Sequence, residues 1–131
     1  MRLEVSRRTD LALRVVRAVA DAALAERGPI SGRRLAEDLA TSPPYLAGVV
    51  APLLARGWIS SRSGPGGGYS AGPGLAEVTV LDVVEAVEGP LDESSCVLQG
   101  GRCGATPCAF HTAWLEARAA LRGALAARPV A

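Results

Sequence analysis

Three cysteines and one histidine are the residues of this chain best suited to chemistry. Cys96, Cys103 and Cys108 lie within thirteen residues, and His111, the only histidine, follows three residues after the last of them. Three thiolates and an imidazole can supply four ligands to zinc or to an iron–sulfur cluster. The glycines of this segment would let the chain wrap around a metal, but the spacing alone does not choose between the two.

Other interpretations of these residues stay open at this point. A disulfide switch would use the same thiols, and it is compatible with iron binding because a cluster can be lost and the thiols oxidised. An enzyme with Cys108 as nucleophile and His111 as base is disfavoured, because no third group orients the base. Asp10 is a further candidate ligand, although it could simply form a helix-surface ion pair with Arg14, four residues on.

Composition excludes several classes of protein. The chain has 131 residues, which fits one domain or one domain with an added arm, and 49% of them are hydrophobic, which excludes a disordered chain. No apolar run is long enough to cross a membrane, and the N-terminus lacks an apolar signal core, so we expect a cytoplasmic protein. Because cytoplasmic thiols stay reduced, clustered cysteines indicate metal or redox chemistry before structural disulfides.

Arginines are concentrated in the first half of the chain. Residues 1–70 contain ten arginines and six acidic residues, which gives a net charge of +4. Residues 71–131 contain four arginines and seven acidic residues, which gives a net charge of −3. The basic half is a candidate for contact with nucleic-acid phosphates, although the excess is small.

The apolar periodicity predicts a mainly α-helical protein with a small β-hairpin. Helices are expected over 6–26, 32–39, 43–56, 80–88 and 107–127. A strand is expected over 58–62, followed by a glycine-rich turn at 63–68 and a return strand. The order helix, turn, helix and glycine-tipped hairpin is typical of a winged helix-turn-helix. The turn lacks the Lys-Ser/Thr of a nucleotide-binding loop.

We expect a DNA-binding winged helix at 1–75, and a connecting helix, cysteine loop and long C-terminal dimerisation helix at 76–131. The second helix of such a motif reads the major groove with its N-terminal residues, and the wing lies against phosphates or the minor groove. The predicted DNA contacts are Arg33, Ser42, Pro43, Tyr45, Arg62, Ser63, Gly64, Gly66, Gly67, Gly68 and Tyr69.

Together these segments resemble the Rrf-two family of bacterial winged-helix regulators. The resemblance covers essentially the whole chain and rests on TDLALR, SPPYLAGVVAPLLARGWISS, GPGGGY, VTVLDVVEAVEGPLD and the cysteines followed by HTAW. It implies a transcription regulator, usually a repressor, that binds a palindromic double-stranded DNA operator as a homodimer. It also implies an iron–sulfur cluster on the three cysteines whose state tunes DNA affinity, with zinc as the alternative metal.

Two branches of this family place the fourth cluster ligand differently. The nitric-oxide sensors use an aspartate in a TDLALR-like segment, which Asp10 matches, and the regulators of cluster biogenesis use a histidine three residues after the last cysteine, which His111 matches. We favour His111 because it follows Cys108 closely in the chain, whereas Asp10 would have to be brought to the cysteines from another element. A histidine ligand favours [2Fe–2S] over [4Fe–4S]. The chain departs from the family at Ser63, where the family usually has arginine, so that Arg62 lies one position earlier.

Overall fold

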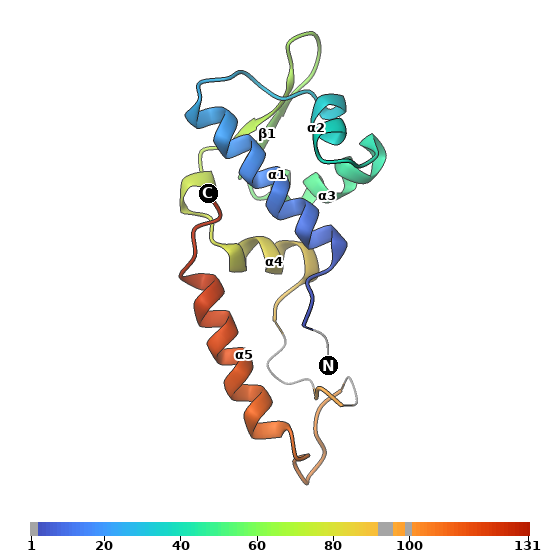
Figure 1. Ribbon diagram of the computed structural model, residues 1–131, viewed down its shortest axis with the longest axis vertical. Helices are drawn as coiled ribbons and strands as arrows, with labels where there is room; N and C mark the ends of the chain where they lie inside the picture. The colour runs from blue at the N-terminus through green and yellow to red at the C-terminus, as the bar shows by residue number, and fades with distance from the viewer. Residues whose placement is uncertain (1–2, 92–95, 99–100) are drawn as a thin grey trace.

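Five α-helices and one two-stranded antiparallel sheet make up the computed structural model, which describes residues 3–91, 96–98 and 101–131 (Figure 1). The predicted mainly α-helical winged fold is therefore confirmed, while part of the predicted cysteine loop lies outside the described residues. The elements are α1 (Arg7–Leu24), α2 (Gly32–Asp38), α3 (Pro43–Ala55), β1 (Ile59–Arg62), β2 (Gly68–Ala71), a 3-10 turn (Leu75–Glu77), α4 (Val80–Glu88) and α5 (His111–Ala126).

Four of the helices begin at a hydroxyl side chain that accepts a hydrogen bond from the backbone three residues on. Ser6, Ser31, Ser42 and Thr79 cap α1, α2, α3 and α4 in this way. Asp82 completes a capping box at α4, because its carboxylate accepts the Thr79 N–H at 2.8 Å. Each cap satisfies a backbone N–H that the helix itself leaves unpaired, and so fixes where the helix begins.

The last helix begins later than the sequence pattern predicts. It starts at His111 rather than at residue 107, and its N-cap, Phe110, makes no side-chain capping hydrogen bond. The His111 N–H instead donates to the Cys108 carbonyl at 3.0 Å, so the chain from Cys108 to His111 forms a separate turn. The apolar pattern before His111 therefore belongs to the turn that carries Cys108.

The β-hairpin is fixed to the body of the protein by glycine positions. Its register runs from Ile59 opposite Ala71 to Arg62 opposite Gly68. Gly68 has a φ of +140°, and a Cβ there would lie 2.2 Å from the Ile30 carbonyl oxygen. Only glycine allows this approach, which lets the neighbouring Tyr69 exchange backbone hydrogen bonds of 2.9 and 2.8 Å with Ile30. The wing is thus hydrogen-bonded to the segment that leads into α2.

One buried hydrophobic cluster joins the two predicted parts of the chain. It contains Val15 of α1, Leu53 of α3 and Val83 of α4, and also Val130 near the C-terminus. The C-terminal residues reach it because the Val130 N–H donates to the Val78 carbonyl at 2.9 Å. The core therefore includes residues from both sides of the expected boundary at residue 75, and that boundary stays a prediction.

Helix α5 extends away from the winged helix and packs beside α4 (Figure 1). An ion pair of 2.8 Å between Arg122 and Glu85 joins the two helices. No residue of α5 is buried, and Leu121 is 50% exposed. Within the described part of the chain, no helix combines the length and the apolar character needed to span a membrane.

Candidate functional site

The three cysteines converge although they are spread along the segment before α5. The Cys108 sulfur lies 3.7 Å from that of Cys96 and 3.8 Å from that of Cys103, and all three sulfurs are within 4.8 Å of one another. Cys96 is buried and the other two are half-buried, and none of the three forms a disulfide. The three sulfurs are therefore close enough to ligate one metal ion.

Local backbone contacts hold two of the three sulfurs. The Cys96 N–H donates a hydrogen bond to the Gly101 carbonyl. On the other side, the turn from Cys108 to His111 connects the cysteine cluster directly to the start of α5. Cys108 therefore lies only three residues before the first residue of α5.

The crowding of the thiols affects their ionisation. A backbone hydrogen bond with Cys108 lowers the pKa of Cys103. The hydrogen-bonded thiol of Cys96 raises this pKa, as do burial and the thiol and charge of Cys108. Together they hold the pKa of Cys103 above its usual value. Three thiolates this close repel one another. A metal cation removes that repulsion, and soft thiolate ligands favour zinc or iron–sulfur clusters, so the three residues fit such a group.

The fourth ligand is not part of this sulfur cluster. Among the described residues, the group of potential metal-ligating atoms within 4.8 Å of one another consists of the three cysteines, without His111 or Asp10. His111 is half-buried at the start of α5. Asp10 is exposed on α1, where its carboxylate lies 3.9 Å from the guanidinium of Arg14, as the ion-pair alternative predicted. Both residues stay predicted ligands.

A glutamate that sequence reasoning missed connects α4 to the start of α1. Glu88, the last residue of α4, accepts a hydrogen bond of 3.0 Å from the Ser6 N–H and another from the Thr9 hydroxyl. Thr9 is completely buried. These hydrogen bonds, first that from Thr9 and then that from Ser6, lower the pKa of Glu88. The only signal in the sequence was a threonine on the apolar side of α1.

The start of α1 in turn contacts the second helix of the helix-turn-helix. The Arg8 guanidinium donates to the Gly48 carbonyl at 3.0 Å, and the Arg7 guanidinium lies 5.9 Å from the centre of the Tyr45 ring. Tyr45 is 40% exposed on the first turn of α3. Residues at the start of α1 therefore contact the N-terminal half of α3, the part that is predicted to meet DNA.

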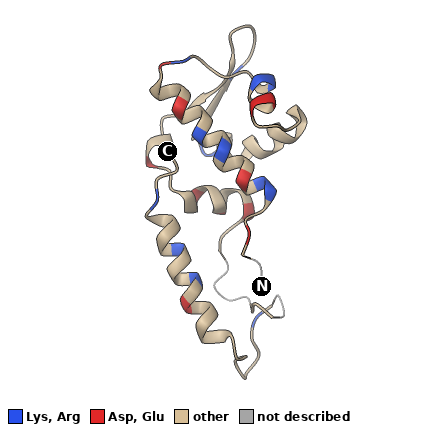
Figure 2. Cartoon of the chain, in the orientation of Figure 1, with Lys and Arg blue, Asp and Glu red and all other residues tan. Residues whose placement is uncertain are grey.

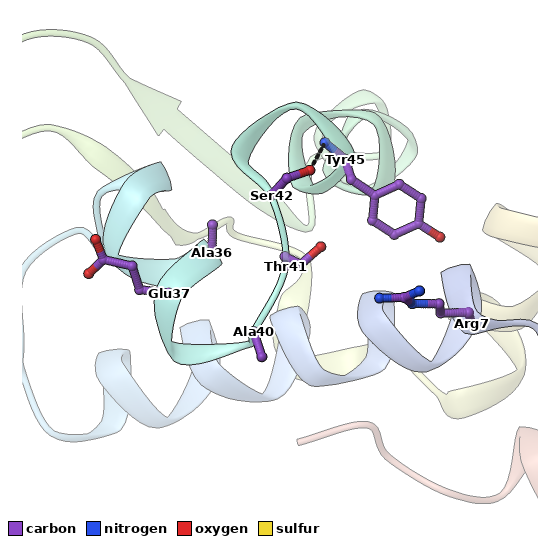
Figure 3. Close-up of a pocket in the computed structure, with 7 residues that line it drawn as sticks. All are labelled: Arg7, Ala36, Glu37, Ala40, Thr41, Ser42 and Tyr45. Carbon is purple, nitrogen blue, oxygen red and sulfur yellow. Dashed lines mark hydrogen bonds between the residues drawn. The ribbon is translucent and has the colours of Figure 1, made fainter.

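Three predicted DNA contacts lie together at this end of α3. The Ser42 hydroxyl accepts the Tyr45 N–H at 3.3 Å (Figure 3). Pro43 is the first helical residue. The predicted contact Arg33 is exposed on α2. In Figure 2 the basic residues follow α1 and α2, with acidic residues between them, in agreement with the modest positive charge of this half.

The other predicted contacts lie in the hairpin, where their roles differ. Arg62 is exposed at the end of β1, and its guanidinium donates to the Gly66 carbonyl across the turn at 3.3 Å. Ser63 and Gly64 are exposed at the tip, whereas Tyr69 is half-buried against the core. Gly67 and Gly68 are enclosed by backbone atoms, so their glycine character serves the fold of the wing. Contact of these residues with DNA stays a prediction.

Comparisons with known proteins agree with this fold. A family model described as "Rrf2: Iron-dependent Transcriptional regulator" matches residues 5–131. The HTH-type transcriptional regulators IscR of Klebsiella pneumoniae and Escherichia coli are each 34% identical over 111 residues, which cover 84% of this chain and 68% of theirs.

Solved structures show the same architecture. CymR of B. subtilis, described as the global cysteine regulator, superposes with a TM-score of 0.79 at 25% identity, covering 98% of this chain and 94% of its own. IscR of T. potens superposes with a TM-score of 0.67 at 20% identity, covering 98% of this chain and 83% of its own. The second likeness concerns the fold alone.

Proposed function

This chain belongs to the Rrf2 family of transcriptional regulators, and from that premise we propose that it is a DNA-binding repressor controlled by an iron–sulfur cluster. The observation that carries the proposal is the convergence of three cysteine sulfurs within 4.8 Å of one another in a chain with a winged-helix fold. Because it would bind chromosomal DNA, the protein would act in the cytoplasm.

Cys96, Cys103 and Cys108 would hold the cluster, and His111 would complete the ligand set of a [2Fe–2S] centre. When bound, such a cluster supplies a centre that responds to redox state, nitric oxide or iron supply. His111 is favoured over Asp10 because a single turn links it to Cys108, whereas Asp10 lies on α1 beside Arg14. Zinc on the same thiols is the alternative, with a structural rather than a sensing role.

Exposed apolar side chains of α5 support assembly as a homodimer. Phe110, Leu115 and Leu121 are 47%, 39% and 50% exposed on or next to this helix. Large apolar side chains gathered on one helix are typical of a surface that a partner covers. Two copies joined through α5 would place two winged helices on the two halves of a palindromic operator.

A chain of contacts gives the cluster a route to the DNA-reading helix. The segment with the cysteines follows α4, whose last residue, Glu88, bonds to Ser6 and Thr9 at the start of α1. The next residues along this route, Arg7 and Arg8, contact α3. If cluster loss reshapes the segment after Glu88, α1 and α3 would shift with it. DNA affinity would then change to the extent that the two shapes bind DNA differently.

The test is to purify the protein without oxygen and to measure its visible absorption together with its iron and sulfide content. We expect a coloured protein with matched iron and sulfide, and loss of both in Cys103→Ala. The same protein, loaded and metal-free, is then titrated with duplexes recovered from a random-sequence library. A colourless protein that holds zinc would contradict the cluster, and equal DNA affinity in both forms would contradict the sensing role.

Two matched variants identify the fourth ligand. His111→Ala should alter the absorption spectrum and lower the cluster content, whereas Asp10→Asn should leave both unchanged. The reverse result would move the fourth ligand to Asp10 and remove the argument for [2Fe–2S].

A further inference from the structure

A hollow of about 620 Å³ lies between the start of α1 and the turn that joins α2 to α3. Arg7 enters it from α1, and Thr41, Ser42 and Tyr45 line it from the turn and from α3. In Figure 3 the Arg7 guanidinium, the Thr41 hydroxyl and the Tyr45 ring face the same space, whereas Glu37 lies on the far side and points away from Arg7. One cation and three hydroxyl groups therefore surround one side of this hollow.

The backbone at the start of α3 offers little to an anion. Pro43 and Pro44 have no N–H, and the Tyr45 N–H is already donated to the Ser42 hydroxyl oxygen at 3.3 Å. An anion in the hollow would therefore have to be bound by side chains. Because the Ser42 oxygen acts as an acceptor in its cap, its own proton is free to be donated.

Arg7 is suited to this task. Its guanidinium carries five donors in a planar fork that matches the geometry of a phosphate. The Tyr45 ring, 5.9 Å from the Arg7 guanidinium carbon, attracts the cation and directs it toward the hollow. Arg7 itself is exposed, so the hollow is open to a large ligand.

We propose that this hollow binds a backbone phosphate of double-stranded DNA and that Arg7 is its principal ligand. The inference rests on the proposed DNA-binding function and adds a contact that the reading of base edges does not require. In helix-turn-helix proteins the reading helix enters the major groove while a preceding helix crosses the backbone, and phosphate contacts set the register of the protein on the duplex. Arg7 lies where α1 would meet the phosphates beside the groove that α3 enters.

Salt dependence distinguishes a phosphate contact from a merely structural role. Affinity for a fluorescent duplex selected from a random library is measured between 50 and 200 mM salt for the wild type, Arg7→Ala, Arg7→Lys and Arg17→Ala. Arg17 is the matched control, because it is exposed on the same helix and paired with Asp21 at 3.3 Å. Thermal unfolding of each variant verifies that it is folded.

We expect Arg7→Ala to bind more weakly and to lower the slope of log affinity against log salt by about 0.9 for each bound subunit. Between those two salt concentrations the wild type should then lose about 3.5-fold more affinity per subunit than Arg7→Ala. Arg7→Lys should keep the slope, and Arg17→Ala should match the wild type. An unchanged slope in Arg7→Ala would overturn the proposal, and a wild type that binds no duplex would overturn the DNA-binding function with it.

Neutral linkages in the DNA locate the contact. Single phosphates of the selected duplex are replaced by methylphosphonates, one position at a time. One position in each half-site should weaken binding by the wild type and have no effect on Arg7→Ala, because the contact is already lost. If every position weakens both proteins equally, Arg7 does not bind a phosphate and the proposal is wrong.

Discussion

Replacing Glu88 by glutamine tests whether the contact between α4 and α1 depends on charge. The glutamine oxygen can still accept hydrogen bonds from the Ser6 N–H and the Thr9 hydroxyl, so the shape of the contact is kept. What is lost is the added strength of a hydrogen bond to an ionised acceptor. Glu88 is itself exposed, which screens its charge, so we expect a loss of about 1 kcal/mol of unfolding free energy at pH 7.

The pH dependence of that loss follows from the lowered pKa of Glu88. Its folded pKa is depressed by Thr9 and Ser6 from the usual 4.5, so the carboxylate stabilises the fold above that value. As the pH falls through the folded pKa, the carboxylate is protonated and its advantage over glutamine disappears. The difference between wild type and Glu88→Gln should therefore be largest near neutral pH and shrink below 4.5.

Urea unfolding of the reduced, metal-free protein at a series of pH values measures this difference without a contribution from metal loss. Glu116→Gln, on the surface of α5, serves as the control for removing an exposed glutamate charge, and we expect it to show no such pH dependence. A difference of the same size at neutral and acid pH, or none at pH 7, would refute the reasoning. Glu88 would then act through shape alone, or would not join the helices in solution.

Further substitutions test the wing, the exposed apolar surface of α5 and the start of α4. Gly68→Ala should cost at least about 2 kcal/mol of unfolding free energy by urea titration, because the added Cβ would lie 2.2 Å from the Ile30 carbonyl oxygen. Gly64→Ala, whose Cβ meets nothing within 4 Å but whose φ is +85°, should cost only about 1 kcal/mol. Leu121→Glu should shift the sedimentation of the protein from dimer toward monomer while the helical circular dichroism persists, because this side chain is 50% exposed in the single chain; an unchanged dimer would exclude this face of α5 as the interface. Thr79→Ala removes half of the capping box of α4 and should lower the unfolding free energy by about 1 kcal/mol, whereas Thr79→Ser should retain it.

The sequence alone determined the local elements of this protein. The helices expected from residues 32, 43 and 80 begin at those residues, and the hydroxyl of the preceding Ser31, Ser42 or Thr79 caps each of them. The glycines of the hairpin predicted a wing, and the grouped cysteines predicted a metal site. These features depend on residues near one another in the chain, and so their physical causes, capping, periodicity and turn geometry, can be recognised in the sequence.

Only the tertiary structure decided which of these elements meet. Glu88 and Thr9 are 79 residues apart, and no periodicity relates them. Arg7 lies beside Tyr45 because α1 crosses α3, and His111 begins α5 because Cys108 occupies a separate turn. Such contacts arise from the packing of whole helices around a shared core, which brings distant residues together. Local preferences along the chain do not specify these contacts, and the geometry of the thiol cluster and of the hollow at Arg7 therefore required the folded structure.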